Sequence, residues 1–290
     1  MSFRTVVISQ RCKLDFSMNY LVQRTGDTTQ RVRLDDIMLL LIENPAVSIT
    51  GCLLEALVKA KVRVVFCDSQ HNPLSELAPL YGSHDCVRKL RYQLAWSEAT
   101  KKQVWRLIVQ QKIANQALLL EQREKKEEAN MLKGYIGQVT DGDESNREGH
   151  AAKVYFNALF GMTFTRNEEN SINSALNYGY SLILSCVNRE VTNCGYMTQL
   201  GIFHDNVFNK FNLSCDLMEP FRPIVDRAVA SENIAQFTTE TKRALLSILE
   251  TEVQIDGARH VLPNAIKRFV QLFFDAMGNN APQSLKFPVL

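Results

Sequence analysis

Residues 97–126 read SEATKKQVWRLIVQQKIANQALLLEQREKK, and this stretch decides the fold class. Its apolar side chains recur at the spacing of one face of an α-helix, as at Val104, Leu107 and Ile108. Such a period over so long a segment predicts a long amphipathic helix. The helical pattern continues towards the C-terminus, where we expect helices at about 147–160, 170–190, 216–231, 239–252 and 263–277. This part of the chain is therefore predicted to be all-α.

The pattern on the N-terminal side of this stretch is different. Short runs rich in β-branched and aromatic residues, typical of strands, occupy 5–8, 13–16, 20–23, 31–34 and 62–66. One amphipathic stretch, 51–60, predicts a helix packed against the sheet. The period changes between about 75 and 85, after a turn at Asn72 and Pro73. We therefore predict an α+β chain, with a small β-sheet domain over residues 1–78 and a helical domain over residues 79–290.

The composition is that of a soluble globular protein. Apolar residues make up 46% and charged residues 22% of 290 residues, which is close to the average and leaves room for two domains. No apolar run approaches the roughly 18 residues of a membrane-spanning helix, and the first residues lack the features of a secretory signal. The seven cysteines are scattered and form no CxxC pair, which favours reduced thiols. We therefore expect a cytoplasmic protein without membrane contact.

Charge is unevenly distributed along the chain. Residues 81–133 hold eleven Lys and Arg against six Asp and Glu, whereas residues 134–290 hold thirteen against seventeen. A cationic stretch beside a carboxylate-rich region suits a protein that binds a polyanion and also holds a divalent metal.

Three polar features stand out from the helical background. Glu148 lies in REGHAA at the start of a predicted helix, His204 follows an apolar run in GIFHD, and Asp216 and Glu219 open the next predicted helix. Each has a purely structural alternative. Ser145 and Glu148 have the spacing of a capping box, a lone histidine is commonly a hydrogen-bonded structural residue, and carboxylates near a helix start gain stability from the helix dipole.

Taken together, two or three carboxylates and one imidazole form a donor set that suits a divalent ion with open positions for water and phosphate. Other site patterns are absent from the sequence. It contains no GxxxxGK[ST], GxGxxG, GxSxG or HExxH motif, so nucleotide hydrolysis, hydride transfer, serine esterase and zincin chemistry have no local support.

Four segments, in order and spacing, resemble one known family. They are REGHAAKVYF at 147–156, NYGYSLIL at 177–184, LGIFH at 200–204 and DLMEPFRPIVD at 216–226. The family is the CRISPR-associated integrase of the spacer-acquisition machinery, a metal-dependent DNA endonuclease that occurs with a small companion adaptation protein. The resemblance spans the whole chain and is greatest to the type II-A branch.

The resemblance implies roles for particular residues. Glu148, His204 and Glu219 would be both catalytic residues and ligands of Mg²⁺ or Mn²⁺, and Asp216 would be a further ligand or an outer-shell base. The implied reaction joins the 3′-hydroxyl of a captured foreign DNA fragment to the CRISPR repeat by phosphodiester transesterification. Arg222 could reach a phosphate oxygen. Hydrolysis would be the same chemistry with water as the attacking group.

The resemblance also implies partners. We expect a homodimer formed through the β-domain, two such dimers bridged by a dimer of the companion protein, and double-stranded DNA fragments and CRISPR repeat DNA as substrates in a prokaryotic cytoplasm. The basic stretch would contact duplex phosphates through residues at helical spacing, namely Arg88, Arg91, Lys102 and Arg106. The alternative for each is an ordinary solvated side chain. For Tyr92, Trp96 and Trp105 we expect packing between helices rather than base stacking.

Two other functions remain open at this point. One is a non-catalytic nucleic-acid-binding scaffold, in which the polar motifs are helix caps. The other is a plain metal-dependent nuclease with no joining role. The combination of Glu148, His204 and Glu219 favours an enzyme over a scaffold, because capping would not require the histidine.

Overall fold

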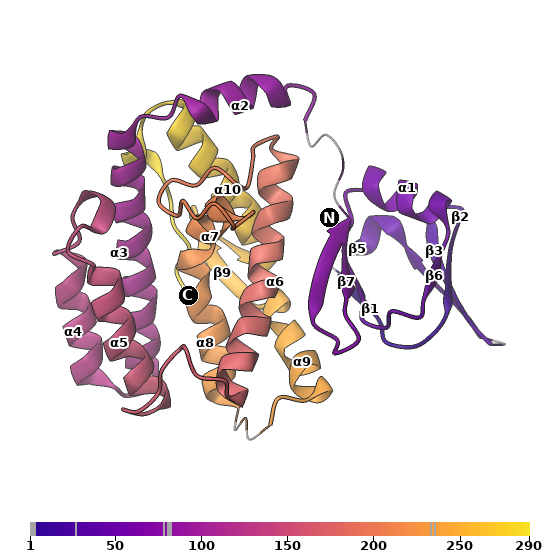
Figure 1. Ribbon diagram of the computed structural model, residues 1–290, viewed down its shortest axis with the longest axis horizontal. Coiled ribbons are helices and arrows are strands. Elements are labelled where there is room, and N and C mark those ends of the chain that lie inside the picture. The colour runs from indigo at the N-terminus through magenta and orange to yellow at the C-terminus, as the bar shows by residue number, and fades with distance from the viewer. Residues whose placement is uncertain (1–3, 27, 78, 80–82, 233, 235) are drawn as a thin grey trace. The chain divides into compact units, whose positions relative to one another are not determined.

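The computed structural model describes residues 4–26, 28–77, 79, 83–232, 234 and 236–290, and the chain divides into two compact units, residues 1–80 and 81–290. Residue 78, where the sequence places the end of the β-domain, lies outside the described residues. The predicted fold class is confirmed, since a strand-rich N-terminal unit is followed by a helical one (Figure 1).

The described residues of the N-terminal unit form two four-stranded sheets. The first has the order β1 (Arg4–Ile8), β5 (Ile37–Ile42), β7 (Arg63–Cys67) and β8 (Pro73–Leu77), of which only the β7–β8 pair is antiparallel. The second has the order β4 (Thr28–Arg33), β3 (Tyr20–Thr25), β2 (Lys13–Ser17) and β6 (Ser48–Ile49). All six residues of β5 are buried, as expected for an apolar strand paired in parallel on both sides.

Helix α1 (Gly51–Lys59) completes the core of this unit. Its N-terminus is capped by Thr50, whose hydroxyl accepts a hydrogen bond from the Leu53 amide. Leu53 and Leu57 are fully buried in one apolar cluster with Leu14 and Leu40 of the strands. The predicted packing of a helix on the sheet is thus confirmed.

The second unit is built from nine α-helices among its described residues. They are α2 (Cys86–Leu94), α3 (Glu98–Gln122), α4 (Lys126–Ile136), α5 (Arg147–Phe160), α6 (Ser171–Asn193), α7 (Asn212–Met218), α8 (Arg222–Ser231), α9 (Thr239–Leu246) and α10 (Leu262–Gly278). The stretch quoted first forms α3, and its N-terminus is capped by the Ser97 hydroxyl, which accepts from the Thr100 amide. None of the described helices is both long and apolar enough to cross a bilayer.

Helices α3 and α6 organise the packing of this unit. Helix α3 lies side by side with α4 and α5, while α6 packs against α7, α8, α9 and α10 (Figure 1). Fully buried aromatic side chains fill the space between these groups, among them Trp105, Tyr155, Phe221, Phe269 and Phe273. Side chains from α3, α5 and the α7–α8 region therefore meet inside the unit.

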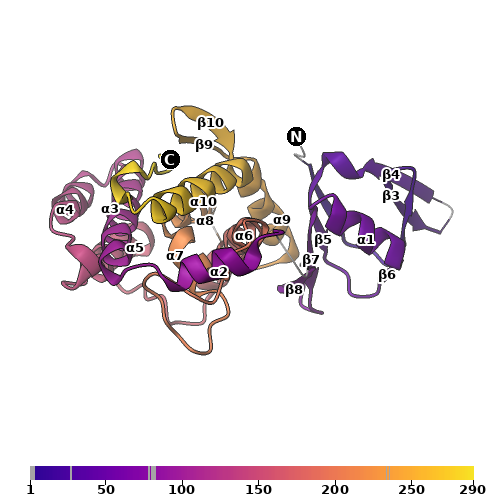
Figure 2. The same ribbon diagram turned by 90° about the horizontal axis from the view of Figure 1, so that it is seen from above.

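Three details differ from the sequence-based expectation. The predicted helix 239–252 ends as α9 at Leu246, is followed by a 3-10 turn over Ser247–Glu250, and gives way to a strand at Glu252. The predicted helix 216–231 is divided into α7, the 3-10 turn η3 (Glu219–Phe221) and α8, with Pro220 and Pro223 in the first turns of η3 and α8. Proline lacks an N–H and starts a helical segment more readily than it continues one. A hairpin, β9 (Glu252–Ile255) and β10 (Ala258–Val261), packs against α10 (Figure 2).

Candidate active site

Two of the predicted site residues meet at a buried lysine. Lys112 of α3 is 8% exposed, and its Nζ lies 2.6 Å from Oε1 of Glu148 and 2.5 Å from Oε2 of Glu219. Sequence reasoning did not single out this lysine. A signal was present, because Lys112 follows Ile108 by four residues and precedes Ile113 on the apolar side of the helix, where a lysine needs an anionic partner.

Glu148 is free to reach Lys112 because other side chains cap its helix. Asn146 at the N-cap accepts from the Gly149 amide, and the two carboxylate oxygens of Asp143 accept from the amides of Arg147 and Glu148. The capping box between Ser145 and Glu148, the structural alternative considered for this glutamate, is therefore wrong.

Glu219 belongs to η3 and is 3% exposed. Its second carboxylate oxygen, Oε1, lies 2.9 Å from Nε of Arg222. Burial alone would raise the pKa of Glu219, but the charges of Arg222 and Lys112 outweigh burial and hold the pKa below its usual value. Burial likewise opposes the charge on Lys112, whose pKa is nevertheless raised by Glu219 and Glu148. The cluster is therefore ionic, with two carboxylates facing two cations.

His204 is oriented by Asp216. The Asp216 carboxylate is fully buried. It accepts hydrogen bonds from the backbone amides of Ile202, Phe203 and His204, with N–O distances of 2.7, 3.2 and 3.1 Å. It also accepts the imidazole Nδ1–H of His204 at 2.6 Å. These four bonds use the acceptor capacity of both oxygens. They direct Nε2 of His204 away from Asp216, which is the arrangement in which a carboxylate orients a metal-binding histidine.

The loop that carries His204 is closed tightly around Asp216. A side-chain carbon at Gly201 would lie 2.3 Å from the His204 carbonyl oxygen and 2.8 Å from Oδ2 of Asp216, so only glycine fits there. On the other side, Phe203 stacks on the buried ring of Trp105 with a centroid distance of 4.2 Å, and His204 meets Trp105 edge-on. The expected packing role of Trp105 is confirmed.

The hydrogen bond to Asp216 raises the pKa of His204 in spite of partial burial, and the charges of Asp216, Glu219 and Glu148 contribute in the same direction. The imidazole therefore lies within electrostatic reach of both glutamates. The structure thus brings Glu148, Glu219 and the His204–Asp216 pair into one region of the unit.

A second layer of buried polar groups supports Arg222. Its guanidinium carbon lies 4.7 Å from the centre of the Tyr180 ring. The hydroxyls of Tyr180 and Tyr155 both donate to Asp226, which is buried in α8. Burial raises the pKa of Asp226 to about 6. Arg222 is thus held between Glu219 and an aromatic face, rather than extended into solvent.

The predicted metal ligands are Glu148, His204 and Glu219, with Asp216 as a further candidate. Among the described residues, no three His, Cys, Asp or Glu side chains stand in metal-binding geometry, because Glu148 and Glu219 both turn to Lys112. The chemistry of the donors nevertheless fits, since two carboxylates and an imidazole oriented by a carboxylate are ligands that Mg²⁺ and Mn²⁺ accept.

The predicted DNA-binding residues of α2 and α3 lie at the surface of the helical unit. Arg88 pairs with Asp85, Lys102 with Glu144 at 3.1 Å, and Arg106 with Asp141 at 2.9 Å. Arg91 is exposed on α2. Each paired cation therefore has a carboxylate neighbour that DNA would have to displace or share.

Sequence comparison identifies relatives of the chain. The family model described as "CRISPR associated protein Cas1" matches residues 5–247. A CRISPR-associated endonuclease Cas1 from Neisseria meningitidis serogroup C is 34% identical over 293 residues, covering 99% of this chain and 96% of the relative. A second relative, CRISPR-associated endonuclease Cas1 1 from Pyrobaculum aerophilum, is 28% identical and covers 74% of this chain and 77% of its own length.

Solved structures share the fold. A Cas1 protein from Thermotoga maritima matches with a TM-score of 0.75 at 17% identity, covering 94% of this chain and 97% of the other. A casposase bound to integration product matches with a TM-score of 0.74 at 19% identity, covering 97% and 91%. A chain of a Cas6-RT-Cas1–Cas2 complex matches with a TM-score of 0.72 at 17% identity, covering 97% of this protein and 36% of that chain. With the family model matching most of its length and a 34% identical relative spanning nearly all of it, the chain belongs to the Cas1 family of CRISPR-associated proteins.

Proposed function

We propose that the chain performs metal-dependent phosphodiester chemistry on DNA at the cluster formed by Glu148, Glu219 and His204. It is an enzyme of CRISPR adaptation, an endonuclease and integrase, which joins the 3′-hydroxyl ends of captured foreign DNA to the CRISPR repeat by transesterification. The observation that carries the site assignment is the convergence of two carboxylates on one buried cation, Lys112, beside a histidine oriented by Asp216.

Glu148, Glu219 and Nε2 of His204 would hold one Mg²⁺ or Mn²⁺ ion. When bound, the ion would polarise the scissile phosphate and lower the pKa of an attacking hydroxyl. Asp216 has no free acceptor for a metal, because four N–H groups already donate to it. We therefore assign Asp216 to orienting His204 rather than to the first coordination sphere.

Lys112 and Arg222 give the site a second property. The two carboxylates and the two cations cancel in formal charge, so the cluster does not repel an anionic phosphodiester as an isolated carboxylate pair would. Both cations are held in place before substrate arrives, Lys112 by Glu148 and Glu219 and the partly exposed Arg222 by Glu219. Cations fixed in this way stabilise negative charge that grows on phosphate oxygens. Lys112 thereby joins Arg222, which the sequence already suggested as a phosphate-contacting residue, in the proposed site.

The attacking group distinguishes integrase from nuclease. The same centre would join strands when a DNA 3′-hydroxyl attacks and cut them when water attacks. A plain nuclease is therefore the alternative function. In that case the parent protein would cut DNA but never join strands, and the variants described below would lose cleavage.

Partners are proposed from the family. One solved structure that shares the fold is a complex with Cas2, and another is a casposase bound to integration product. We propose that this chain likewise binds a small companion of the Cas2 type, double-stranded DNA fragments and CRISPR repeat DNA in a prokaryotic cytoplasm. We further propose that residues 1–78 form the homodimer and that a companion dimer bridges two such dimers.

Phosphate contacts are assigned to the basic surface of α2 and α3, namely Arg88, Arg91, Lys102 and Arg106. Each contact would release counterions, so the affinity for duplex DNA should fall steeply with salt, and about equally for unrelated sequences. The Arg88→Ala/Arg91→Ala variant should have a shallower slope of log affinity against log salt, reduced by the contribution of about two phosphate contacts. An unchanged slope and affinity would show that this surface is merely solvated.

The catalytic assignment is tested by replacing its three residues singly. Glu148→Ala, His204→Ala and Glu219→Ala should each abolish Mg²⁺- or Mn²⁺-dependent strand joining while the circular dichroism spectrum and duplex binding remain. Glu127→Ala, which removes an exposed glutamate of α4, is the matched control and should join strands normally. Full joining by His204→Ala would refute the site.

A further inference from the structure

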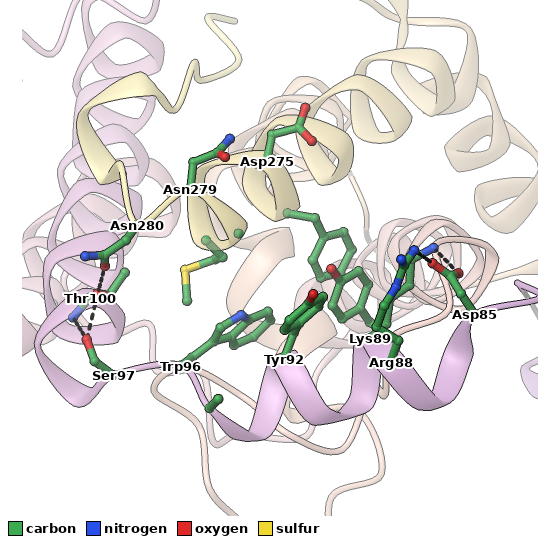
Figure 3. A pocket seen from close by; sticks show the side chains of 15 residues that line it. Asp85, Arg88, Lys89, Tyr92, Trp96, Ser97, Thr100, Asp275, Asn279 and Asn280 are labelled. Carbon is green, nitrogen blue, oxygen red and sulfur yellow. Dashed lines mark hydrogen bonds and ion pairs between the residues drawn. The ribbon is translucent and has the colours of Figure 1, made fainter.

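A cavity of about 600 Å³ lies between α2 and the C-terminal end of α10. In Figure 3, Tyr92 of α2 and Trp96, which follows that helix, lie on one side of the cavity. Asp275 of α10 and Asn279, which caps the end of that helix, lie on the other. All of its lining residues belong to the helical unit, and none is among the proposed metal ligands. Its size suits a small organic ligand or one unit of a polymer.

The cavity contains an aromatic shelf. The rings of Tyr196 and Phe274 are stacked with centroids 3.7 Å apart and planes 7° from parallel, and Trp96 is stacked on Tyr196 at 5.9 Å. Tyr92 stands at the rim with 57% of its surface exposed. Phe274 is buried at 7% exposure, so the rings of the stack that can offer a face to a planar ligand are the partly exposed Trp96 and Tyr196.

Charges are placed at one end of this shelf. Arg88 and Lys89 lie beside Asp85, which pairs with both, the contact to Lys89 being 2.9 Å. Arg88 and Tyr92 are four residues apart and share one face of α2, and Trp96 follows the C-terminal end of that helix.

The lining carries no net formal charge, since Asp85 and Asp275 balance Arg88 and Lys89. A compact polyanion such as a free triphosphate is therefore not the ligand that this cavity fits. The lining fits a ligand with a flat aromatic part, a single negative charge at one end and polar groups that face Asp275.

The cavity is held in shape by buried hydrogen bonds. The side chain of Gln93 donates to the carbonyls of Met197 and Leu200 at 2.8 and 3.0 Å, and accepts from the Met197 amide at 2.9 Å. At the opposite end, the Thr100 hydroxyl bonds to Asn280. A shelf fixed in this way needs little ordering when a ligand binds, which favours affinity.

We propose that this cavity binds one unpaired nucleotide of a DNA strand. The base stacks on the Trp96–Tyr196 shelf under Tyr92, the phosphodiester faces Arg88 and Lys89, and Asp275 accepts from N–H groups on the edge of the base. The proposal rests on the proposed function, since it adds a second DNA-binding site to the same enzyme, separate from the metal ligands.

Tryptophan fluorescence of the full-length chain reports on the cavity directly. Trp105 is fully buried, whereas Trp96 is partly exposed on the shelf. A short single-stranded oligonucleotide should therefore quench Trp96. A strand of equal length with abasic sites keeps the phosphates but lacks bases, and it should bind about tenfold more weakly than the natural strand. At high salt, a blunt duplex should also bind about tenfold more weakly than the natural single strand. Trp96→Phe should abolish the quenching but retain most binding in a fluorescence anisotropy assay.

Two variants on α2 separate the cavity from the surrounding surface. Tyr92→Ala should weaken single-strand binding about tenfold. Leu94→Ala, which removes another exposed apolar side chain of the same helix from outside the cavity, should leave it unchanged. Equal affinity for the natural and abasic strands, or unchanged binding by Tyr92→Ala, would overturn the proposal. A different result would contradict the proposed function. In that case Glu148→Ala would still join strands, while the oligonucleotide would still quench the fluorescence of Trp96.

Discussion

Replacing Lys112 by methionine tests the buried ionic cluster most directly. The substitution keeps a side chain of similar length and removes the ammonium. The contacts of 2.6 and 2.5 Å to the same nitrogen place Oε1 of Glu148 and Oε2 of Glu219 at most about 5 Å apart. Two carboxylate charges at that distance repel by about 3 kcal/mol at an effective dielectric constant of 20. This agrees with the roughly 3–5 kcal/mol lost when a buried ion pair loses one partner.

We therefore expect Lys112→Met to lower the free energy of unfolding by about 3 kcal/mol in a chelating buffer. For a unit of about 200 residues this corresponds to a fall of roughly 6–12 °C in Tm. A divalent ion should reverse the loss, because the two carboxylates then gain a cationic partner that binds only the folded state. Differential scanning calorimetry with and without Mn²⁺ measures both effects, and isothermal titration should show tighter Mn²⁺ binding by the variant than by the parent.

Two controls make the result specific. Lys102→Met removes a lysine from an exposed ion pair on the same helix and should change the unfolding free energy by less than about 1 kcal/mol. Adding Glu148→Gln to Lys112→Met should restore part of the lost stability, because one of the two facing charges is removed. A Lys112→Met variant with the parental Tm and the parental Mn²⁺ response would refute the electrostatic reasoning.

Two further substitutions probe the supports of the site. Gly201→Ala should lower Tm and strand joining together, with a stability loss of about 1–3 kcal/mol, whereas Gly134→Ala, where a side-chain carbon meets nothing within 4 Å, should be tolerated in thermal melts. Asp226 has a folded-state pKa raised by burial to about 6, so protonation favours the fold. Relative to Asp226→Asn, the parent should gain up to about 3 kcal/mol as the pH falls from 7 to 4, and parallel urea-unfolding curves across that range would contradict this.

Much of the fold follows from periodicity in the sequence. The change from short β-branched runs to a 3.6-residue period separates the strands of the first unit from α3 and the later helices. The division of 216–231 was missed because its apolar pattern runs through Pro220 and Pro223 without a break, although each proline starts a new helical segment. The β9–β10 hairpin was missed because its strands have only four residues each, too few for a clear alternation.

The candidate site was accessible from the sequence only in part. The polar residues at 148, 204, 216 and 219 stand out because they lie at predicted helix starts or directly after an apolar run. Lys112 does not, since a lysine on a long helix is ordinarily solvated, and its burial depends on two helices distant in the chain. The capping of α5 by Asp143 and Asn146 rather than by Glu148 was equally hidden, because it depends on hydrogen bonds formed only once the loop before the helix is folded.

The side chain of Gln93 links two parts of the helical unit. It binds main-chain groups of Met197 and Leu200, and these residues lead directly into the Gly201–His204 turn. A displacement of α2 would therefore act first on the segment that carries His204. If a strand lying against α2 changes the affinity of His204 for a cation, thermodynamic reciprocity requires the cation to change the affinity for that strand by the same factor. Gln93→Ala should uncouple the two binding events without removing either.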